Sequence, residues 1–498
     1  MLFNSHIFIL LFLPLLLAGW YFLNWKKKFQ LAQGYLIGMS LWFYAYANLQ
    51  YLWLLLFSCL IGWLLSCLPE KISSEKGKKV LTGVGCVFHL GLLGYFKYSN
   101  FFLENLNTVF HTDFPMLQIL LPVGISFYTF QQLAYLIDRC RGDAPRDSFF
   151  DYLTFMVYFP QLLQGPILLR SEFMEQLKEP ERRRFHAERF SEGIQFFVFG
   201  LAKKVLLADT LAKAVNYGYS NVSMLDSISA LLLAVGYLTE LYFDFSGYCD
   251  MAVGLGKMIG LEVAENFDAP FHSASVKEFW RRWHMTLGGW FRDYLYIPLG
   301  GNRVSVLRWC FNMFVVWLLS GLWHGAGWNF ALWGLYFGVF LSAEKLIEKK
   351  WKERSFKIAD ISANNDSNGG NRKNMFLICA RNSIEHGYVL LVVLFSFVIF
   401  RVESVREIKE QLLGLAGSYG NAMTPMAAYE IKSYLILLLI ACAGATPFPA
   451  MCVQRLKNTN MWKKSGWLLQ SCYILTGLVL ATAFLLGSSV HPFLYFRF

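Results

Sequence analysis

Long apolar runs separated by short polar loops set the pattern of the whole chain. The runs are continuous stretches of Leu, Phe, Ile and Val, and several approach the roughly 20 residues with which a helix crosses a hydrocarbon core of about 30 Å. A segment inside a bilayer must satisfy its own backbone hydrogen bonds, so continuous runs favour helices over barrel strands. The pattern predicts an all-α, polytopic integral membrane protein.

We expect roughly eleven transmembrane helices in a single domain covering residues 1–498, with re-entrant and interfacial helices besides. The twelve apolar runs from which these helices are expected to come are 1–22, 31–48, 51–68, 80–96, 116–137, 193–208, 229–245, 309–323, 328–343, 387–400, 431–444 and 465–486. A further apolar run at 149–169 contains Pro160 and Pro166, which interrupt a helix, so we expect it to be re-entrant or broken and enclosed by protein. The amphipathic segment 405–415 is expected to lie at an interface.

Composition and charge agree with a membrane protein. Of 498 residues, 56% are hydrophobic and 16% charged, and the net charge of +11 comes from lysines and arginines gathered in short loops. Basic short loops mark the cytosolic side of a membrane, which explains the charge better than a nucleic-acid partner does. The loops expected in the cytosol are those at 26–28, 71–79, 139–146, 170–189, 344–357 and 455–464. The Asn-, Ser- and Gly-rich stretch 355–376 is expected to be a flexible cytosolic loop.

The first apolar run has no lysine or arginine before it, and Lys26, Lys27 and Lys28 follow it directly. We therefore expect an uncleaved first span with an extracytoplasmic N-terminus, in the inner (cytoplasmic) membrane of the cell. The ten cysteines lie mostly inside apolar runs and show no CxxC or Cys/His spacing. They are interpreted as buried hydrophobes, and no metal site is expected.

Candidate chemistry concentrates between residues 275 and 328. Ser275 and Glu278 form the S-x-x-E pattern of a capping box, which predicts that a helix begins at Val276. At about 100° per residue, the aromatic and aliphatic positions of 276–294 share one arc beside a basic face, and His284 lies between the two. Such a helix suits the cytosolic membrane interface. Its histidine is either part of a plain interfacial anchor or a functional group, and the residues alone leave both alternatives open.

A second histidine, His324, lies at a turn between two apolar runs and is flanked by Gly321, Gly325 and Gly327. If Arg308 marks the cytosolic edge, about sixteen helical residues with a rise of 1.5 Å place His324 roughly 24 Å across the membrane core. An ionisable side chain at that depth is costly and indicates a functional site, although a histidine hydrogen-bonded between helices is the alternative. His284 and His324 could then stand on opposite sides of the membrane core.

Acidic residues cluster around Tyr242–Tyr248. Glu240 and Asp244 share a helix face, and Asp250 follows them. Because no basic residue lies between positions 213 and 257, these acids need distant partners such as Arg281 or Arg282, or an aqueous boundary. Structural ion pairing is the preferred interpretation over chemistry.

Motifs of other chemistries are absent from the sequence: there is no P-loop, no GxSxG, no HExxH and no GxGxxG. A transporter with a histidine in a proton path remains an alternative, as does a scaffold of a polysaccharide export complex.

Several segments in chain order resemble the membrane-bound O-acyltransferase family, in particular its bacterial branch that acetylates alginate and peptidoglycan. The matching segments are 121–131 (LPVGISFYTFQ), 159–161 (FPQ), 165–167 (GPI), 242–248 (YFDFSGY), 279–284 (FWRRWH), 290–303 (WFRDYLYIPLGGNR), 321–325 (GLWHG) and 492–498 (PFLYFRF). The resemblance implies a ring of transmembrane helices around a thin core, with a cytosolic funnel that meets an outer opening.

The resemblance also implies the reaction. Acetyl-CoA would be the cytosolic donor, a co-substrate that needs no further cofactor or metal. The acceptor would be a hydroxyl of an extracytoplasmic polysaccharide, or of a partner protein that relays the acetyl group. D-alanyl transfer from a carrier protein to teichoic acid is the alternative within the family.

The family's invariant histidine corresponds to His324 and its second signature histidine to His284. We expect burial to keep His324 neutral, so that it can act as general base on the acceptor hydroxyl. The supporting residues expected near it are Trp323, Asp244 and Asn329, the last as a donor to the oxyanion. The phosphates of acetyl-CoA are expected to meet the cations Lys277, Arg281, Arg282 and Arg303.

Overall fold

The structure is a computed structural model that describes residues 1–46, 49–221, 225–362, 371–402, 404–418, 423–487 and 492–494. These residues form helices and loops, with one isolated β-bridge between Phe267 and Trp283. The predicted all-α fold class is confirmed. The chain divides into two compact units, which are described separately: unit 1 is Met1–Thr210, Leu241–Asn266 and Asn460–Phe498, and unit 2 is Leu211–Glu240 and Phe267–Thr459. Whether they act as one domain stays a prediction.

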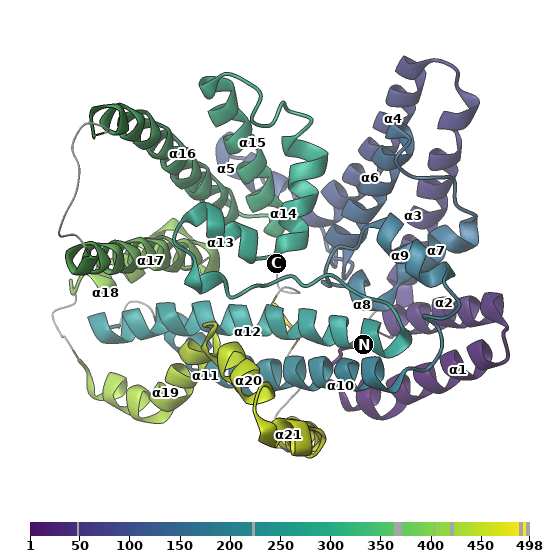
Figure 1. Ribbon diagram of the computed structural model, residues 1–498. Coiled ribbons are helices and arrows are strands. Elements are labelled where there is room, and N and C mark those ends of the chain that lie inside the picture. The colour runs from purple at the N-terminus through teal and green to yellow at the C-terminus, as the bar shows by residue number, and fades with distance from the viewer. Residues whose placement is uncertain are drawn as a thin grey trace. The chain divides into compact units, whose positions relative to one another are not determined.

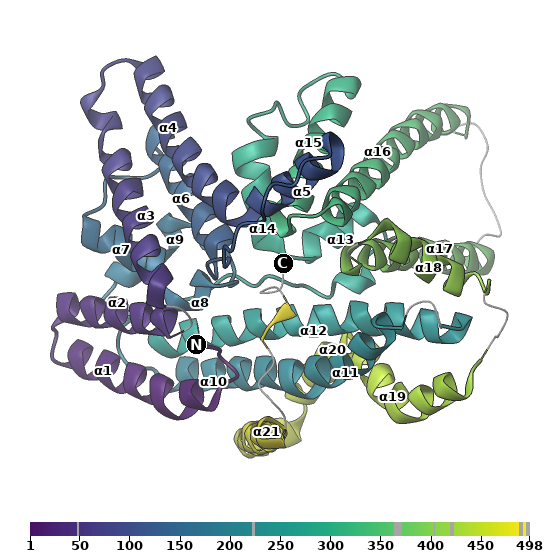
Figure 2. The same cartoon turned by 180° about the vertical axis from the view of Figure 1, so that it is seen from behind.

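Unit 1 contains the N-terminal helices and the last long helix. Its elements are η1 (Phe8–Phe12), α1 (Leu13–Trp25), α2 (Phe29–Ala45), α3 (Leu49–Cys67), η2 (Pro69–Lys71), α4 (Glu75–Leu93), η3 (Gly94–Tyr98), α5 (Ser99–Phe110), α6 (Ile125–Arg141), α7 (Phe149–Val157), α8 (Phe159–Leu162), α9 (Arg170–Lys178), α10 (Ala187–Ala202), η4 (Lys203–Ala208) and α21 (Asn460–Gly487). In Figure 2, α3, α4 and α6 run side by side. The second half of α12 (Ser227–Ile259) also belongs to this unit.

Unit 2 contains the first half of α12 and most of α11 (Asp209–Tyr219). Its other elements are η6 (Pro270–His272), α13 (Val276–Arg282), α14 (Met285–Phe291), η7 (Arg292–Tyr296), α15 (Val306–His324), α16 (Trp328–Ser362), α17 (Asn371–Arg401), α18 (Val405–Leu415), α19 (Pro425–Gly444) and α20 (Phe448–Lys457). The most extensive helix–helix contact in unit 2 is between the antiparallel helices α15 and α16, and α13 packs against this pair (Figure 1). The amphipathic segment predicted at 405–415 is helix α18.

Eight helices in the described part of the chain are long and apolar enough to span a membrane, or nine if the bent pair α19 and α20 is one span. This is fewer than the roughly eleven that we predicted. The runs at 31–48, 116–137 and 193–208 account for the difference. The first forms α2, which is too short, and the second is helical only from Ile125. The third ends in the charged π-helix η4, so it lacks the expected apolar length.

The apolar run at 149–169 is broken, as its prolines predicted. α7 ends at Val157, Tyr158 has non-helical angles (φ −53°, ψ 108°), and the short α8 places Pro160 in its first turn. The side chains from Tyr152 to Leu168 are buried in unit 1. The segment is therefore enclosed by protein, where irregular backbone can be accommodated.

The stretch predicted as a loop at 355–376 is partly helical, because α16 continues to Ser362 and α17 begins at Asn371. Residues 363–370 lie outside the described part, and the flexibility of this loop stays a prediction. Residues 495–498 of the matching segment 492–498 also lie outside it.

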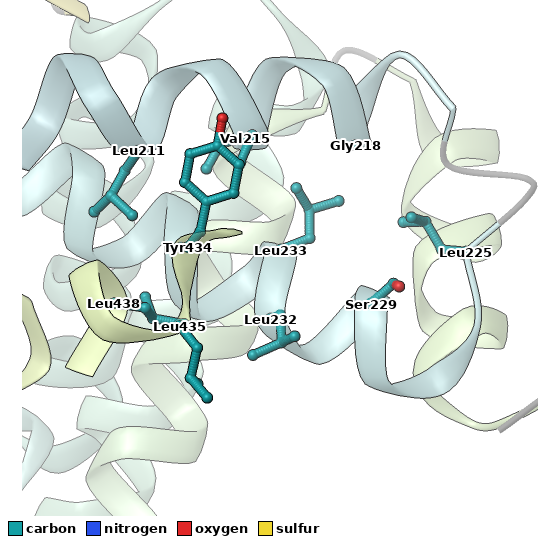
Figure 3. Close-up of a pocket in the computed structure, with 12 residues that line it drawn as sticks. Leu211, Val215, Gly218, Leu225, Ser229, Leu232, Leu233, Tyr434, Leu435 and Leu438 are labelled. Carbon is teal, nitrogen blue, oxygen red and sulfur yellow. The ribbon is translucent and has the colours of Figure 1, made fainter. Parts of the chain in front are cut away.

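An apolar cavity of ≈ 50 Å³ lies in unit 2 between α11, α12 and α19. Figure 3 shows the ring of Tyr434 beside Leu211 and Val215, with Leu435 and Leu438 on the same helix turn. Its lining contains no histidine and no carboxylate. The two candidate histidines, His284 and His324, lie elsewhere in the same unit.

Candidate active site

The helix predicted to start at Val276 is present as α13, and its capping box is formed. The backbone N–H of Glu278 donates to Ser275 Oγ (3.1 Å), and the Glu278 carboxylate accepts from the N–H of Ala274 (3.0 Å). The free N–H groups of the first turn are also satisfied, because Val276 and Lys277 donate to the carboxylate of Glu344 on α16. These hydrogen bonds fix the first turn of α13 and hold it against α16.

The helix ends after Arg282, so the continuous aromatic helix predicted through residue 294 is wrong. Trp283 is extended (φ −107°, ψ 126°), and the N–H of Asp268 donates to the carbonyl of Arg282 (2.9 Å). His284 then adopts the left-handed conformation (φ 47°, ψ 52°) before α14 begins at Met285. That conformation costs a non-glycine residue roughly 1–2 kcal/mol, and such strain concentrates at functional sites.

His324 is the last residue of α15, which confirms the helical path from Arg308 to the histidine. The helix lies very close to α16 here. A Cβ on Gly321 would come within 2.1 Å of the Phe330 carbonyl oxygen, and a Cβ on Gly325 within 2.0 Å of the Phe330 ring. The glycines around His324 therefore allow the close approach of the two helices that encloses its side chain.

Aromatic rings surround the His324 imidazole. The ring centroids of Trp323, Trp333 and Phe400 lie 5.1, 5.1 and 5.4 Å from that of His324, each close to perpendicular. The side chain is 6% exposed. These contacts come from α15, α16 and α17, so His324 is held where the three helices meet in unit 2.

The two histidines lie at the same level, contrary to our expectation that they stand on opposite sides. The His284 ring lies 6.2 Å from the ring of Trp323, which also contacts His324. His284 is 2% exposed, so it is not at a charged membrane edge. The segment before it, through Trp280, packs on Trp333, which also contacts His324.

The reason is a re-entrant path between the two histidines. After His284 the chain returns along α14 and η7 to the start of α15. There, the indole N–H of Trp309 donates to the Tyr296 hydroxyl (2.8 Å), and the Asn312 amide donates to the Leu299 carbonyl (2.8 Å). α15 then carries the chain back to His324, so both histidines are reached from the same end of unit 2.

Burial affects the ionisation of His284, which lies outside the candidate spans. Loss of solvation lowers its pKa from 6.5 to about 3, which keeps the imidazole neutral near neutral pH. A neutral imidazole can accept a proton or donate one hydrogen bond, which suits a relay or an orienting role.

We expect the protein to lose stability as the pH falls from about 6.5 toward 3, because the unfolded chain protonates His284 in this range and the folded protein does not. The unfolded state then binds more protons, so the free energy of unfolding falls by up to about 1.4 kcal/mol per pH unit. Asparagine tolerates the left-handed conformation, so His284→Asn should reduce this acid sensitivity. Apparent melting temperatures in detergent between pH 4.5 and 7.5 measure it.

The matched control is His186→Asn, which changes an exposed histidine of unit 1. It should leave the pH dependence of the melting temperature as in the wild type. Equal acid sensitivity in His284→Asn and the wild type would contradict a neutral, buried His284.

Cations gather at the end of unit 2 where α13 begins. Lys277, Arg281 and Arg303 are exposed and form no ion pair within the described chain. Lys277 and Arg281 share a face of α13. Arg282 differs, because it pairs with Glu278 (2.9 Å) and Asp268 (3.4 Å). Three of the four predicted donor-binding cations are thus available to an anion, and Arg282 is engaged in holding α13.

Lys345 is a cation of the same region that the sequence did not single out. Its ammonium donates to Asn302 Oδ1 (2.8 Å), lies 3.7 Å from the Trp309 ring centroid, and is close enough to Lys277 for the two charges to repel. In the sequence, Lys345 follows the last aromatic residue of α16 by little more than one helix turn, and this position was the one signal that pointed to a role in anion binding. Two neighbouring ammonium groups beside an exposed amide form a surface suited to a phosphate or carboxylate.

Asn329 lies beside the site but has a structural contact. Its side-chain amide donates to the Phe400 carbonyl (3.2 Å) and thereby ties the start of α16 to the end of α17. Trp333 is a donor that sequence reasoning missed. Its indole nitrogen is buried without a hydrogen-bond partner in the described chain, and its ring contacts His324.

Asp244 belongs to unit 1, and the predicted partners Arg281 and Arg282 were wrong. Its carboxylate pairs with Lys204 of η4 (2.5 Å) and accepts from the N–H of Leu494 (2.9 Å). Lys204 also pairs with Asp209 (2.8 Å). Asp244 therefore holds a buried ion pair that fixes residues 492–494 against unit 1. Within the described residues no group of three His, Cys, Asp or Glu side chains could hold a metal.

Comparison with known proteins adds independent information to this geometry. Residues 143–364 match the model of the membrane-bound O-acyltransferase family. The chain is 32% identical to a peptidoglycan O-acetyltransferase of Helicobacter pylori over 100% of this chain and 98% of that protein. It is 40% identical to a probable alginate O-acetylase of Azotobacter vinelandii over 70% of this chain and 69% of that protein. A teichoic acid D-alanyltransferase of Bacillus subtilis is 28% identical over 47% of this chain and 60% of that protein.

Proposed function

Because the chain belongs to the membrane-bound O-acyltransferase family, we propose that it moves an acetyl group from cytosolic acetyl-CoA to a hydroxyl of an extracytoplasmic polysaccharide, directly or through a relay protein. It is a multi-pass membrane enzyme that transfers acyl groups. The observation that carries the proposal is the buried His324 in its aromatic enclosure, reached from a cationic end of the same unit.

The donor binds at the cationic end, which faces the cytosol in this proposal. The phosphates of acetyl-CoA meet Lys277, Arg281 and Arg303, to which the structure adds Lys345. Charge-assisted hydrogen bonds to phosphate are the strong contacts that these side chains provide. The acetyl thioester then extends along α13 toward the histidines.

His324 acts as general base at the thioester. The acceptor hydroxyl oxygen attacks the acetyl carbonyl carbon while the imidazole takes the hydroxyl proton. The tetrahedral intermediate collapses, the carbon–sulfur bond breaks, and the proton passes to the departing CoA thiolate. A thiol of pKa about 8.5 leaves readily, so no strong acid is needed. The products are the O-acetyl ester and free CoA.

The neighbouring groups position and stabilise this step. His284, held neutral beside Trp323, orients the donor or relays the proton. Asn329 was the expected donor to the developing oxyanion, but its amide already donates to the Phe400 carbonyl. The buried indole N–H of Trp333 is a second candidate donor to the oxyanion.

The experiment is an acetyl-transfer assay with purified protein in lipid nanodiscs, acetyl-CoA and an oligosaccharide acceptor. Release of CoA thiol that depends on the acceptor, together with a mass increase of one acetyl group on the sugar, supports the proposal. Substrate flux across the membrane without thioester cleavage would instead indicate a transporter. A polymer whose acetylation in cells survives His324→Ala would indicate a scaffold.

Replacing Arg281 with alanine should raise the KM for acetyl-CoA by about 3- to 30-fold, because one phosphate contact is lost, while kcat changes little. Initial rates at varied acetyl-CoA measure this. Arg308→Ala is the matched control, since Arg308 is an exposed arginine whose guanidinium lies over Phe311. An unchanged KM in Arg281→Ala would count against the cationic end as the donor site.

The runner-up is D-alanyl transfer from a carrier protein to teichoic acid, which the Bacillus subtilis relative supports over about half of the chain. In that case an acidic carrier protein would meet the same cations. A carrier-linked D-alanyl thioester would be consumed and acetyl-CoA would not. We also propose that the enzyme lies in the inner membrane with its N-terminus outside the cytosol, as the basic loops predict.

A further inference from the structure

A second group of polar side chains lies in unit 2 next to Phe400, which contacts the His324 ring. This Arg401 cluster consists of Asn216, Tyr219, Tyr237, Glu240, Arg401 and Gln411, from α11, α12, the end of α17 and α18. The Arg401 guanidinium lies 4.8 Å from the Tyr219 ring centroid and 5.7 Å from that of Tyr237. It also donates to Asn216 Oδ1 (3.2 Å).

Most of the cluster is buried, and Arg401 and Tyr219 are its partly exposed members. Tyr237, Glu240 and Gln411 are 1%, 2% and 0% exposed, whereas Arg401 and Tyr219 are half-buried. The two tyrosine rings meet edge to face at 5.8 Å. Glu240 is close enough to Tyr219 for its charge to act on the phenol. A cation, a carboxylate, two tyrosines and two amides thus lie together in unit 2.

Two buried polar groups of the cluster, the Gln411 amide and the Tyr219 hydroxyl, have few partners in the described chain. Neither the nitrogen nor the oxygen of the Gln411 amide has a hydrogen-bond partner in the described chain, although both atoms are buried. The Tyr219 hydroxyl is also buried and lies near enough to this amide to interact with it, and neither group has another hydrogen-bond partner in the described chain. Buried polar groups are normally paired, so groups with few partners indicate a place where a ligand or a water molecule binds.

The cluster adjoins the reaction centre through one residue. Phe400, directly before Arg401, packs against the His324 imidazole at 5.4 Å, and its carbonyl accepts from Asn329. Lys345 lies sixteen residues further along α16 than Asn329, about 24 Å at 1.5 Å per residue, and Lys277 donates its N–H to Glu344 beside it. A ligand at the Arg401 cluster therefore approaches His324 from the side away from the donor.

We propose that the Arg401 cluster is a subsite for the acceptor saccharide, an inference that rests on the proposed acetyl transfer. Planar guanidinium, carboxylate and amide groups each pair with adjacent sugar hydroxyls, and tyrosine faces cover the apolar face of a pyranose. The charges of Arg401 and Glu240 offset one another, which suits hydroxyl groups rather than the phosphates of the donor. The subsite fixes which sugar hydroxyl reaches His324.

The experiment measures saccharide binding and acetyl transfer separately. The N-acetylglucosamine tetramer and tetragalacturonate are titrated into the full-length protein in nanodiscs, and tryptophan fluorescence and native mass spectrometry report binding. His324→Ala should bind at least one of the two sugars as the wild type does. Gln411→Leu and Tyr219→Phe should each weaken that binding, and raise the KM for the same sugar, by about 3- to 10-fold, because each removes a neutral hydrogen bond.

Controls separate a binding role from a structural one. Gln411→Leu replaces a buried amide, whose one polar neighbour is the Tyr219 hydroxyl, by an apolar group of similar size, so it should change the melting temperature little. Tyr217→Phe removes a hydroxyl from an exposed tyrosine of the same helix and should bind the sugar as the wild type does. The KM for acetyl-CoA should be unchanged in Gln411→Leu, Tyr219→Phe and Tyr217→Phe.

The outcomes are distinguishable. Wild-type affinity in Gln411→Leu and Tyr219→Phe, or no binding of either sugar by the wild type, overturns the subsite. Competition of the bound sugar by acetyl-CoA would also overturn it, since donor and acceptor would then share one place. Saccharide binding that the variants weaken, without any acetyl transfer by the wild type, supports the subsite while the proposed function fails.

Discussion

Replacing His324 with alanine is expected to lower kcat for acetyl transfer by about 10²- to 10⁴-fold, because the acceptor hydroxyl loses its general base. The imidazole is enclosed by Trp323, Trp333 and Phe400, so water has little room to replace it as a proton acceptor. Acetyl-CoA binding should persist, because the cations that hold the phosphates lie near the start of α15 and the middle of α16, away from His324. Single-turnover acetyl transfer in nanodiscs measures the loss.

The control is His186→Ala, an exposed histidine of unit 1 that should retain the wild-type rate. Folding of His324→Ala is checked by its melting temperature and by its KM for acetyl-CoA. A well-folded His324→Ala protein with near-normal turnover would remove this histidine from the mechanism.

Replacing Lys204 with methionine is expected to lower the free energy of unfolding by about 3–5 kcal/mol, the usual cost of leaving a buried charge without its partner. Lys204 is 1% exposed and serves two carboxylates, Asp244 at 2.5 Å and Asp209 at 2.8 Å. Its ammonium also lies 4.5 Å from the Phe493 ring centroid. Thermal unfolding in detergent, followed by tryptophan fluorescence, measures the change.

Lys257→Met provides the comparison, because Lys257 pairs with Glu192 at 3.0 Å on the surface of the same unit, where Glu192 is 58% exposed. Surface pairs contribute about 0–1 kcal/mol, so its melting temperature should stay near that of the wild type. Similar melting temperatures for the two variants would show that the Lys204 pair is not an essential part of unit 1.

The parts of the fold that follow from local pattern were predictable. The apolar run at 309–323 became α15, and the capping box placed the start of α13 at the correct residue. The amphipathic period at 405–415 marked α18 at both ends. In each case the hydrophobic period or a cap determines the backbone within a few residues, without help from distant contacts.

The parts that depend on distant contacts were not predictable. The hydrophobic arc of 276–294 continues through position 284, because a single left-handed residue does not change the order of apolar side chains. Lys204 was assigned to an apolar span, so its pairing with Asp244, 40 residues later, was hidden. Two of the three aromatic partners of His324, Trp333 and Phe400, come from other helices, which no spacing along the chain reveals.

The re-entrant path from Val276 to Ser305 has a consequence for topology mapping. The segment begins beside Glu344 and ends where Lys345 contacts Asn302, so it enters and leaves at one end of unit 2. We expect the segment not to cross the membrane, which leaves the chain before and after it on the same side. Reporter proteins fused at 273 and at 304 should therefore give the same compartment, and all the arginines between these points count toward the charge of that one side.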